Sequence, residues 1–222
     1  MKKIIKLAGC ALLASASAGV MAQEAGTFLF KAGYTYIEPV ISSGNLSAPS
    51  LPNTQVTIGN AGTFSFSGTY MFTDNISTEV YGGLPIKHDM YGAGSIQGVG
   101  VIGSVKQLPP TIFAQYRFYA ANAAFRPYVG LGLTYAHFQD ETGSAVFTAI
   151  TNPGGPPTTF KVKDAWGGTP QIGFTSWINK QWYFDFALNK TFIKTTTKLS
   201  TGQSINVGLN PVVTAVSIGY KF

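Results

Sequence analysis

Residues 211–222 alternate strictly between two kinds of side chain. One parity is mostly apolar or aromatic and consists of Val212, Thr214, Val216, Ile218, Tyr220 and Phe222. A period of two is typical of a β-strand with two different faces. A soluble sandwich would bury the apolar face against a second sheet, whereas a transmembrane β-barrel would turn it toward lipid and place aromatic rings at the membrane interface. This strand alone is compatible with both folds, and the start of the chain helps to decide between them.

The first 22 residues have the organisation of a secretory signal peptide. Three lysines precede a short apolar run, and Val20-Met21-Ala22 fits a small-x-Ala cleavage site. We therefore expect a signal peptide over residues 1–22 and a single domain over residues 23–222. Because the only cysteine, Cys10, would leave with the signal, we expect no disulfide, thiol catalysis or cysteine metal site in the mature domain.

The composition favours a membrane barrel over a secreted sandwich. Charged residues make up 11% of the chain, against roughly 25% in soluble domains, and aromatic residues make up 14%. No apolar stretch of the mature chain is long enough for a transmembrane helix, which needs about 20 residues. The 12 basic and 9 acidic residues of the mature domain are dispersed, so the charge gives no indication of nucleic-acid binding.

Eight segments repeat the two-residue period, at residues 28–37, 63–72, 76–84, 111–118, 125–138, 168–177, 182–193 and 212–222. The connections alternate between short ones (73–75, 119–124, 178–181) and long ones (38–62, 85–110, 139–167, 194–210). An even strand number with short periplasmic turns and long extracellular loops is typical of outer-membrane barrels. The sequence therefore predicts an all-β fold, an eight-stranded antiparallel transmembrane β-barrel in the outer membrane.

The same alternation assigns side chains to the barrel interior. The inward charges all fall in the periplasmic half and form a predicted polar floor of Lys31, Glu79, Arg117, Arg126, Asp185 and Lys221. Buried charges of this kind must pair. The outer half of the lumen carries no charge and includes Phe113, Phe138, Ile193 and Val213. Since such a barrel has room for side chains or one small ligand, we expect a structural, sealed floor beneath a neutral cup that an apolar molecule could leave only sideways.

Six sequence runs carry a resemblance to a known family. They are Glu24-Ala25-Gly26, Thr73-Asp74-Asn75-Ile76, Gln107-Leu108-Pro109-Pro110-Thr111, Phe125-Arg126-Pro127-Tyr128-Val129-Gly130, Lys163-Asp164-Ala165-Trp166-Gly167 and Tyr220-Lys221-Phe222. In this order, across essentially the whole mature chain, they resemble the outer-membrane protein W (OmpW) family of Gram-negative bacteria. The resemblance implies a narrow channel for passive uptake of small hydrophobic molecules, which enter from outside and leave laterally into the membrane. The expected partners are these solutes, outer-membrane lipid with lipopolysaccharide, and the barrel assembly machinery. The alternative is a structural or receptor-type barrel with a sealed interior.

The resemblance also implies a constriction at Tyr81 and Trp166. Tyr81 stands where the family has an aliphatic residue and adds a hydroxyl group. By counting, Trp166 is out of phase with the inward Gln171, so it would reach the lumen only if a bulge near Gly167 and Gly168 reversed the phase.

Two features of the long loops are open to two interpretations each. Pro85, Pro109 and Pro110 lack an N–H and either end strands at a loop or weaken the wall for a lateral exit. Residues 95–105 are apolar and glycine-rich, which is compatible with a ligand-binding surface or with loops that pack against one another.

Signals for catalysis are weak. The chain has two histidines, His88 and His137. His137 lies near Asp140, Glu141 and Ser144 in sequence, but no motif fixes a triad geometry. A lipid enzyme would need a His-Ser-acid cluster on the upper rim. We expect no enzyme, no metal site and no cofactor.

Overall fold

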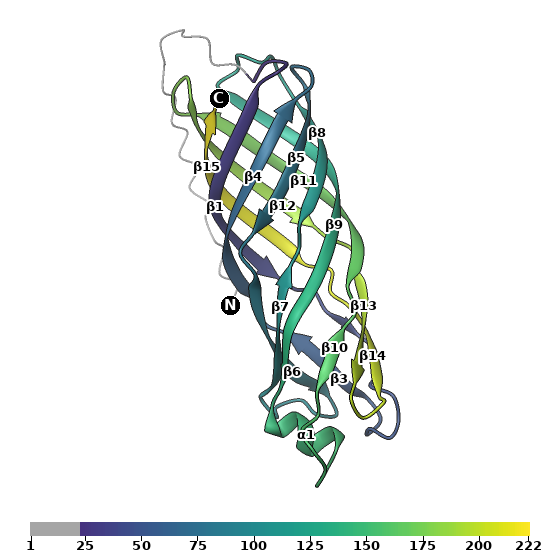
Figure 1. Ribbon diagram of the computed structural model, residues 1–222. Coiled ribbons are helices and arrows are strands. Elements are labelled where there is room, and N and C mark those ends of the chain that lie inside the picture. The colour runs from purple at the N-terminus through teal and green to yellow at the C-terminus, as the bar shows by residue number, and fades with distance from the viewer. Residues whose placement is uncertain (1–22) are drawn as a thin grey trace, which may run out of the picture.

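The computed structural model describes residues 23–222, so the predicted signal peptide lies outside the described residues. Eight strands form a closed antiparallel barrel (Figure 1). In chain order they are β1 (Phe28–Glu38), β4 (Ala61–Met71), β5 (Ile76–Gly83), β8 (Thr111–Arg117), β9 (Phe125–Gly143), β11 (Ala165–Trp177), β12 (Trp182–Lys190) and β15 (Val212–Lys221). Because β1 pairs with β15 and β11 pairs with β9, the ladder runs around the whole barrel. The predicted fold is confirmed.

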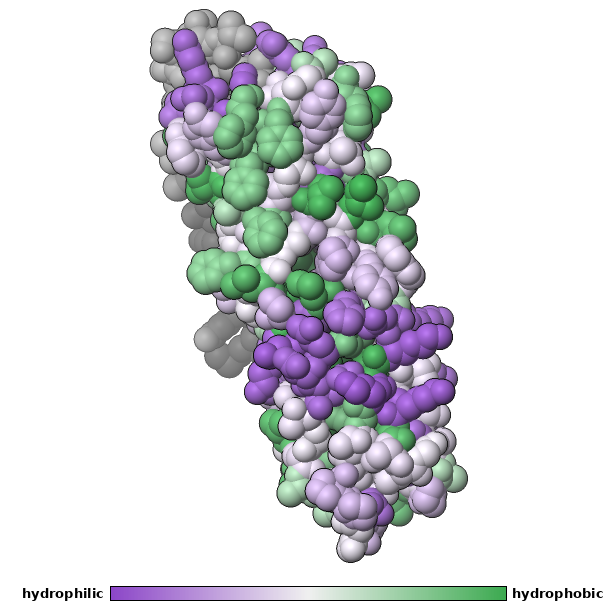
Figure 2. All heavy atoms as spheres, viewed as in Figure 1, coloured by the Kyte–Doolittle hydropathy of each residue, from purple (hydrophilic) through white to green (hydrophobic). Residues whose placement is uncertain are grey.

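The outer face of the barrel forms a broad apolar band (Figure 2). Outward side chains such as Phe64 and Leu131 are 67% and 68% exposed, while Ser65 and Thr134 on the inward parity are 3% and 4% exposed. The apolar face thus points away from the protein interior, as expected when lipid surrounds the barrel. Among residues 23–222, no helix is long and apolar enough to cross a membrane.

Three short connections close one end of the barrel, between β4 and β5, β8 and β9, and β11 and β12. Each of two turns is organised by a side chain that accepts backbone hydrogen bonds. Thr73 Oγ1 accepts from the N–H groups of Asn75 (3.2 Å) and Ile76 (2.9 Å), and Asn179 Oδ1 accepts from those of Gln181 (2.9 Å) and Trp182 (2.8 Å). Side chains of these types substitute for backbone partners in tight turns.

At the other end, the predicted long loops are largely strands. The extension of β9 continues into a sheet of order β9-β7-β6-β3, with β7 (Val101–Leu108), β6 (Ile86–Gly94) and β3 (Thr54–Ile58). A second sheet has the order β10-β13-β14-β2, with β10 (Phe160–Val162), β13 (Lys194–Leu199), β14 (Ser204–Gly208) and β2 (Ser42–Ser43). Helix α1 (Ala145–Thr151) lies at the tip (Figure 1). We call these elements the extracellular extension.

The extracellular extension has an apolar core to which both of its sheets contribute. Its buried side chains include Val56, Met90, Ile102, Val105, Phe138, Phe160, Leu199, Ile205 and Val207. Within the apolar stretch 95–105, Ile102 and Val105 are 1% and 4% exposed. For these two residues, packing among the loops is the interpretation that the structure supports.

Strand β11 starts at Ala165, three residues earlier than predicted. Its register with β9 runs without a shift from Ala165↔Ala136 to Ser176↔Phe125. Because no bulge interrupts this pairing, side chains keep their phase along the whole strand. Gln171 and Gly167 therefore face inward and Trp166 faces outward.

Candidate functional site

A buried cluster of charges closes the periplasmic half of the lumen. Lys31 Nζ lies 2.7 Å from Asp185 Oδ1 and 2.9 Å from Glu79 Oε1. The three residues come from different strands and are at most 5% exposed. Tyr128 adds a hydroxyl that donates to Asp185 Oδ1 at 3.1 Å. One ammonium thus bridges two carboxylates across the barrel.

Arg117 and Arg126 are also buried in the floor, but they bind neutral oxygens. Arg117 donates to the side chains of Thr175 (3.0 Å) and Gln115 (3.0 Å). The Gln115 amide in turn donates to Glu79 Oε2 at 2.5 Å. Arg126 Nη2 donates to the carbonyl of Asp74 at 2.6 Å, and its other nitrogens bind turn carbonyls and Gln23. We expected both arginines beside Glu79 and Asp185. Arg117 reaches these carboxylates through Gln115 and Thr175 rather than directly, whereas Arg126 binds turn carbonyls and Gln23.

Lys221, the sixth predicted floor residue, lies opposite Leu29 at the end of the β1–β15 ladder and is partly exposed. It is on the inward parity, as expected, but nearer to solvent than the other five.

A collar of hydroxyl groups lies above the charges. Thr35 Oγ1 contacts Ser65 Oγ at 2.7 Å and Tyr81 Oη at 2.5 Å. On the opposite wall, four threonines form a chain with oxygen separations of 2.8, 2.6 and 3.1 Å. They are Thr111 of β8, Thr134 of β9, Thr169 of β11 and Thr191, which directly follows β12. Because these hydroxyls bind one another, the collar offers few free hydrogen-bonding groups to a ligand. The two-residue alternation of the sequence places most of these residues inside the barrel, but only the structure reveals that their hydroxyl groups interact.

A cavity of about 50 Å³ occupies the neutral cup around this collar. Its lining includes Tyr81 and three of the predicted upper-lumen residues, Phe113, Ile193 and Val213. For comparison, an engineered cavity of ~150 Å³ in a protein core binds benzene. The volume of the cup is about a third of that, so we expect an aromatic ligand to enter only when the walls move.

Two smaller cavities lie in the extracellular extension. One of about 20 Å³ is lined by Phe138, the fourth predicted upper-lumen residue, together with His88 and Gln107. It shares Gln107 and other lining residues with the cup. The second, also about 20 Å³, lies deeper in the extension core beside Phe147. The three cavities are mainly lined by apolar side chains and follow one another from the extension to the cup, but they are not joined into one channel.

The structure does not place Trp166 at the constriction. Its side chain is 62% exposed, and its ring lies 4.8 Å from the ring of Tyr135 on the outer surface. The predicted position was wrong because the required bulge is absent, and Gly167 occupies the inward position instead. Tyr81 does face the lumen, and its role as a constriction stays a prediction.

The backbone ladder beside the cup is broken. Strands β5 and β8 pair up to Tyr81↔Thr111, and pairing resumes between β6 and β7 at Ile86↔Gln107. The three prolines singled out in the sequence, Pro85, Pro109 and Pro110, all lie in this gap. Gly82, Gly83 and Pro109 line the cup at the same place. The wall between cup and exterior therefore lacks cross-strand hydrogen bonds at this point.

The residues considered for a catalytic triad have other partners. His137 Nδ1 lies 2.8 Å from Asp164 Oδ2, a pair that sequence distance did not indicate. Although burial opposes it, hydrogen bonds from His137, the Phe138 N–H and Tyr135 lower the pKa of Asp164. Ser144 caps α1 by accepting from the Phe147 N–H (3.1 Å), and Asp140 pairs with Lys106 (2.9 Å). Within the described part of the chain, no three His, Cys, Asp or Glu side chains gather in a way that could hold a metal ion.

Comparisons with known proteins agree with this architecture. The model of the OmpW family matches residues 24–222. Outer membrane protein W of Vibrio cholerae is 37% identical, with 97% of this chain and 98% of the relative covered. The Escherichia coli protein of the same name is 32% identical over the whole length of both chains. The crystal structure of OprG from Pseudomonas aeruginosa superposes with a TM-score of 0.83 at 27% identity, over 92% of this chain and 99% of that one.

These matches extend over the barrel, the extension and the floor, and the curated relatives are outer-membrane proteins. The chain therefore belongs to the OmpW family and is a multi-pass β-barrel protein of the bacterial outer membrane.

Proposed function

We propose that the barrel takes up small hydrophobic molecules passively, from the extracellular side, and releases them laterally into the membrane. The observation that carries this proposal is the position of the cup. It lies directly above the buried Lys31–Glu79–Asp185 cluster and directly beside the break in the β5–β8 ladder. An apolar molecule in the cup thus has a polar obstacle below it and a weakened wall beside it.

The floor disfavours passage into the periplasm. Moving an apolar molecule through it would separate Lys31 from its two carboxylates, and a buried charge that loses its partner costs ~3–5 kcal/mol. The lateral route requires no such separation. In the gap between Tyr81↔Thr111 and Ile86↔Gln107, no cross-strand pairing has to be broken before the strands part.

The name of one curated relative supports a hydrophobic substrate class. A Pseudomonas aeruginosa relative, 24% identical over 73% of this chain, is named for a dibenzothiophene metabolism operon. Dibenzothiophene is a fused aromatic compound without ionisable groups. An apolar cup with internally satisfied hydroxyls suits molecules of this class better than sugars or ions.

A cross-link across the gap tests the lateral exit. The domain 23–222 has no cysteine, so Leu84→Cys with Leu108→Cys introduces an unambiguous pair on the two sides of the break. The matched control is Val80→Cys with Ile112→Cys, directly opposite residues of the intact ladder. Each variant is reconstituted in liposomes, and uptake of a fluorescent polycyclic aromatic probe is measured before oxidation, after it, and after reduction.

We expect oxidation of the gap pair to slow probe uptake and reduction to restore it, while the control pair has no effect. Liposomes that lack protein set the background, and a small hydrophilic solute reports leakage. If wild-type protein raises uptake of neither solute, the sealed structural or receptor-type barrel becomes the better account. If it raises hydrophobic uptake but the gap cross-link changes nothing, the channel stands and the lateral exit lies elsewhere.

A further inference from the structure

The second sheet of the extracellular extension presents a row of lysines on its outer face. Lys161 belongs to β10, Lys163 follows it, and Lys194 and Lys198 belong to β13. All four are exposed, while Thr195, Thr197 and Leu199 on the other parity of β13 are buried. We call this set the lysine face.

The lysine face brings like charges close together. Lys161 and Lys198 are directly opposite in the β10–β13 register. The Lys163 N–H donates to the Thr196 carbonyl at 2.9 Å, which continues the same register toward Lys194. Directly opposed like charges destabilise a pair of strands, so this arrangement has a cost that no contact within the sheet explains.

Acidic residues compensate only one of the four. Lys161 Nζ lies 2.7 Å from Glu141 Oε2, a carboxylate that also accepts from the Val162 N–H. Asp164 is nearby in sequence but binds His137, Tyr135 and the Phe138 N–H. Within residues 23–222, the ion pairs include none formed by the other three lysines. They are available to an external anion.

The height of the lysine face corresponds to lipid headgroups. Phe192 and Trp166 are 57% and 62% exposed and belong to the outward aromatic residues at the extracellular rim of the barrel. Lys194 follows Phe192 by two residues, and Lys163 precedes Trp166 by three. At ~3.3 Å per residue along the strand, the backbone of these two lysines lies roughly 7–10 Å beyond the aromatic rim, and less along the membrane normal because barrel strands are tilted. Figure 2 shows the corresponding change from the apolar band to a hydrophilic band at this end of the barrel.

We propose that the lysine face binds the phosphate groups of the glycolipid of the outer leaflet, lipid A. Ammonium groups form charge-assisted hydrogen bonds with phosphate oxygens, and Lys163, Lys194 and Lys198, which have no acidic partner among the described ion pairs, would donate them. A basic residue at an anionic membrane surface contributes ~1 kcal/mol, or about fivefold in affinity. This site is separate from the proposed transport route, and its existence does not depend on that function.

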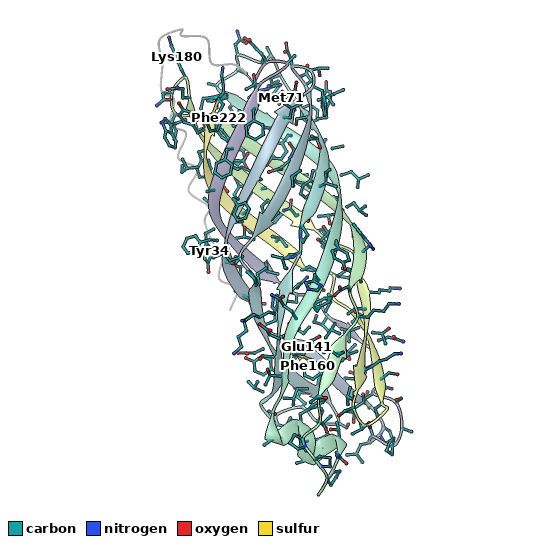
Figure 3. The ribbon with its side chains drawn as sticks, in the orientation of Figure 1. Tyr34, Met71, Glu141, Phe160, Lys180 and Phe222 are labelled. Atoms are coloured by element: carbon teal, nitrogen blue, oxygen red, sulfur yellow. The ribbon has the colours of Figure 1, made fainter. Side chains whose placement is uncertain are left out.

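The test is a titration of the folded full-length barrel in neutral detergent with diphosphorylated lipid A, which yields an apparent Kd. The variant K163Q/K194Q/K198Q removes the three uncompensated charges. Lys180→Gln is the matched control, since Lys180 is exposed in the turn at the opposite end of the barrel, far from Glu141 (Figure 3). Folding of each variant is checked by heat-modifiable mobility on gels, and Lys198→Gln alone serves if the triple variant does not fold.

We expect the triple variant to bind diphosphorylated lipid A about a hundredfold more weakly, Lys198→Gln about fivefold more weakly, and Lys180→Gln as well as wild type. Lipid A without its phosphates should bind wild type and triple variant equally weakly. The proposal is overturned if the folded triple variant keeps wild-type affinity, or if the dephosphorylated lipid binds wild type as tightly. Competition by inorganic phosphate at the same concentration as lipid A would assign the face to free anions and would also overturn it.

Discussion

At the scale of single residues, the floor depends on Lys31. This ammonium is within 2.9 Å of two carboxylates that are themselves almost inaccessible to solvent, Glu79 and Asp185. The two carboxylates would repel one another without it. A buried network of this kind is stable only while each charge keeps its partner.

Replacing Lys31 with methionine should therefore destabilise the barrel strongly. The substitution keeps an unbranched apolar stem but leaves two buried carboxylates unpaired, so we expect a loss of ~3–5 kcal/mol. Urea unfolding midpoints in lipid or detergent measure it, with Lys180→Met in an exposed turn as the control. Equal midpoints for the two variants would mean that water reaches the floor and screens its charges.

His88 in the extracellular extension makes a pH-dependent contribution. Burial lowers its pKa, although the Gly59 carbonyl, 3.3 Å from Nδ1, and Asp89 act in the opposite direction. The unfolded segment therefore binds a proton at a higher pH than the folded one. The stability of the extension is full above the ordinary histidine pKa and falls as the pH is lowered through it.

Amide hydrogen exchange in β6 and β7 should report this dependence. After correction for intrinsic exchange rates, we expect protection to fall between pH 7.5 and pH 5 in wild type. His88→Gln keeps a donor for Gly59 but does not titrate, so its protection should change less over the same range. An identical loss in both proteins would assign the pH dependence to other groups.

At the scale of elements, strand phase decides which aromatic residue can act in the lumen. Tyr81 of β5 faces the cup, and Trp166 of β11 faces outward. We expect Tyr81→Asp to slow uptake of an apolar probe, because a carboxylate in a dry lumen costs several kcal/mol unless it is paired. Trp166→Asp should leave uptake nearly unchanged. The reverse order in a liposome uptake assay would show that Trp166 moves into the path when the protein opens.

The two-residue period predicted the eight barrel strands and the inward side chains, but not the extracellular strands. Strand β9 was expected to end at 138, yet it continues to Gly143 through Gln139, Asp140 and Glu141. Asp140 has a positive φ of 54°, and the β7–β9 register shifts between Ser104 and Lys106. An irregular strand with charges on it resembles a loop, because the alternation that identifies a strand is locally lost.

The sequence could predict which side chains of the site point into the barrel, because the two-residue alternation of each strand determines this. The parity of each strand placed Lys31, Glu79 and Asp185 inside, but their distances depend on the stagger between strands, which sequence alone does not give. The error at Trp166 has the same origin. Family resemblance favoured the lumen and counting favoured the exterior, and the uninterrupted β9–β11 register supports the counting.

At the scale of the whole molecule, closure of the barrel brings the two ends of the described chain together. The Phe222 N–H donates to the Phe28 carbonyl at 3.0 Å, and the two rings lie 6.0 Å apart (Figure 3 labels Phe222). Deleting Phe222 removes this hydrogen bond and the outward aromatic residue that directly follows β15. We expect a smaller folded, heat-modifiable fraction in outer-membrane preparations, whereas Phe222→Tyr should fold normally. Unchanged abundance of the deletion variant would argue against a role in assembly.

The separate cavities along the axis have a kinetic consequence for a transporter of this kind. Since the three cavities described between the extension and the cup have volumes of only about 50, 20 and 20 Å³, each passage of an aromatic solute would wait for a rare open conformation, and the rate would scale with the population of that conformation. Uptake through the barrel would then rise steeply with temperature and level off at high solute concentration. A water-filled pore shows neither behaviour. Initial uptake rates at several temperatures and concentrations would therefore distinguish a wall that opens transiently from a pore that is always open.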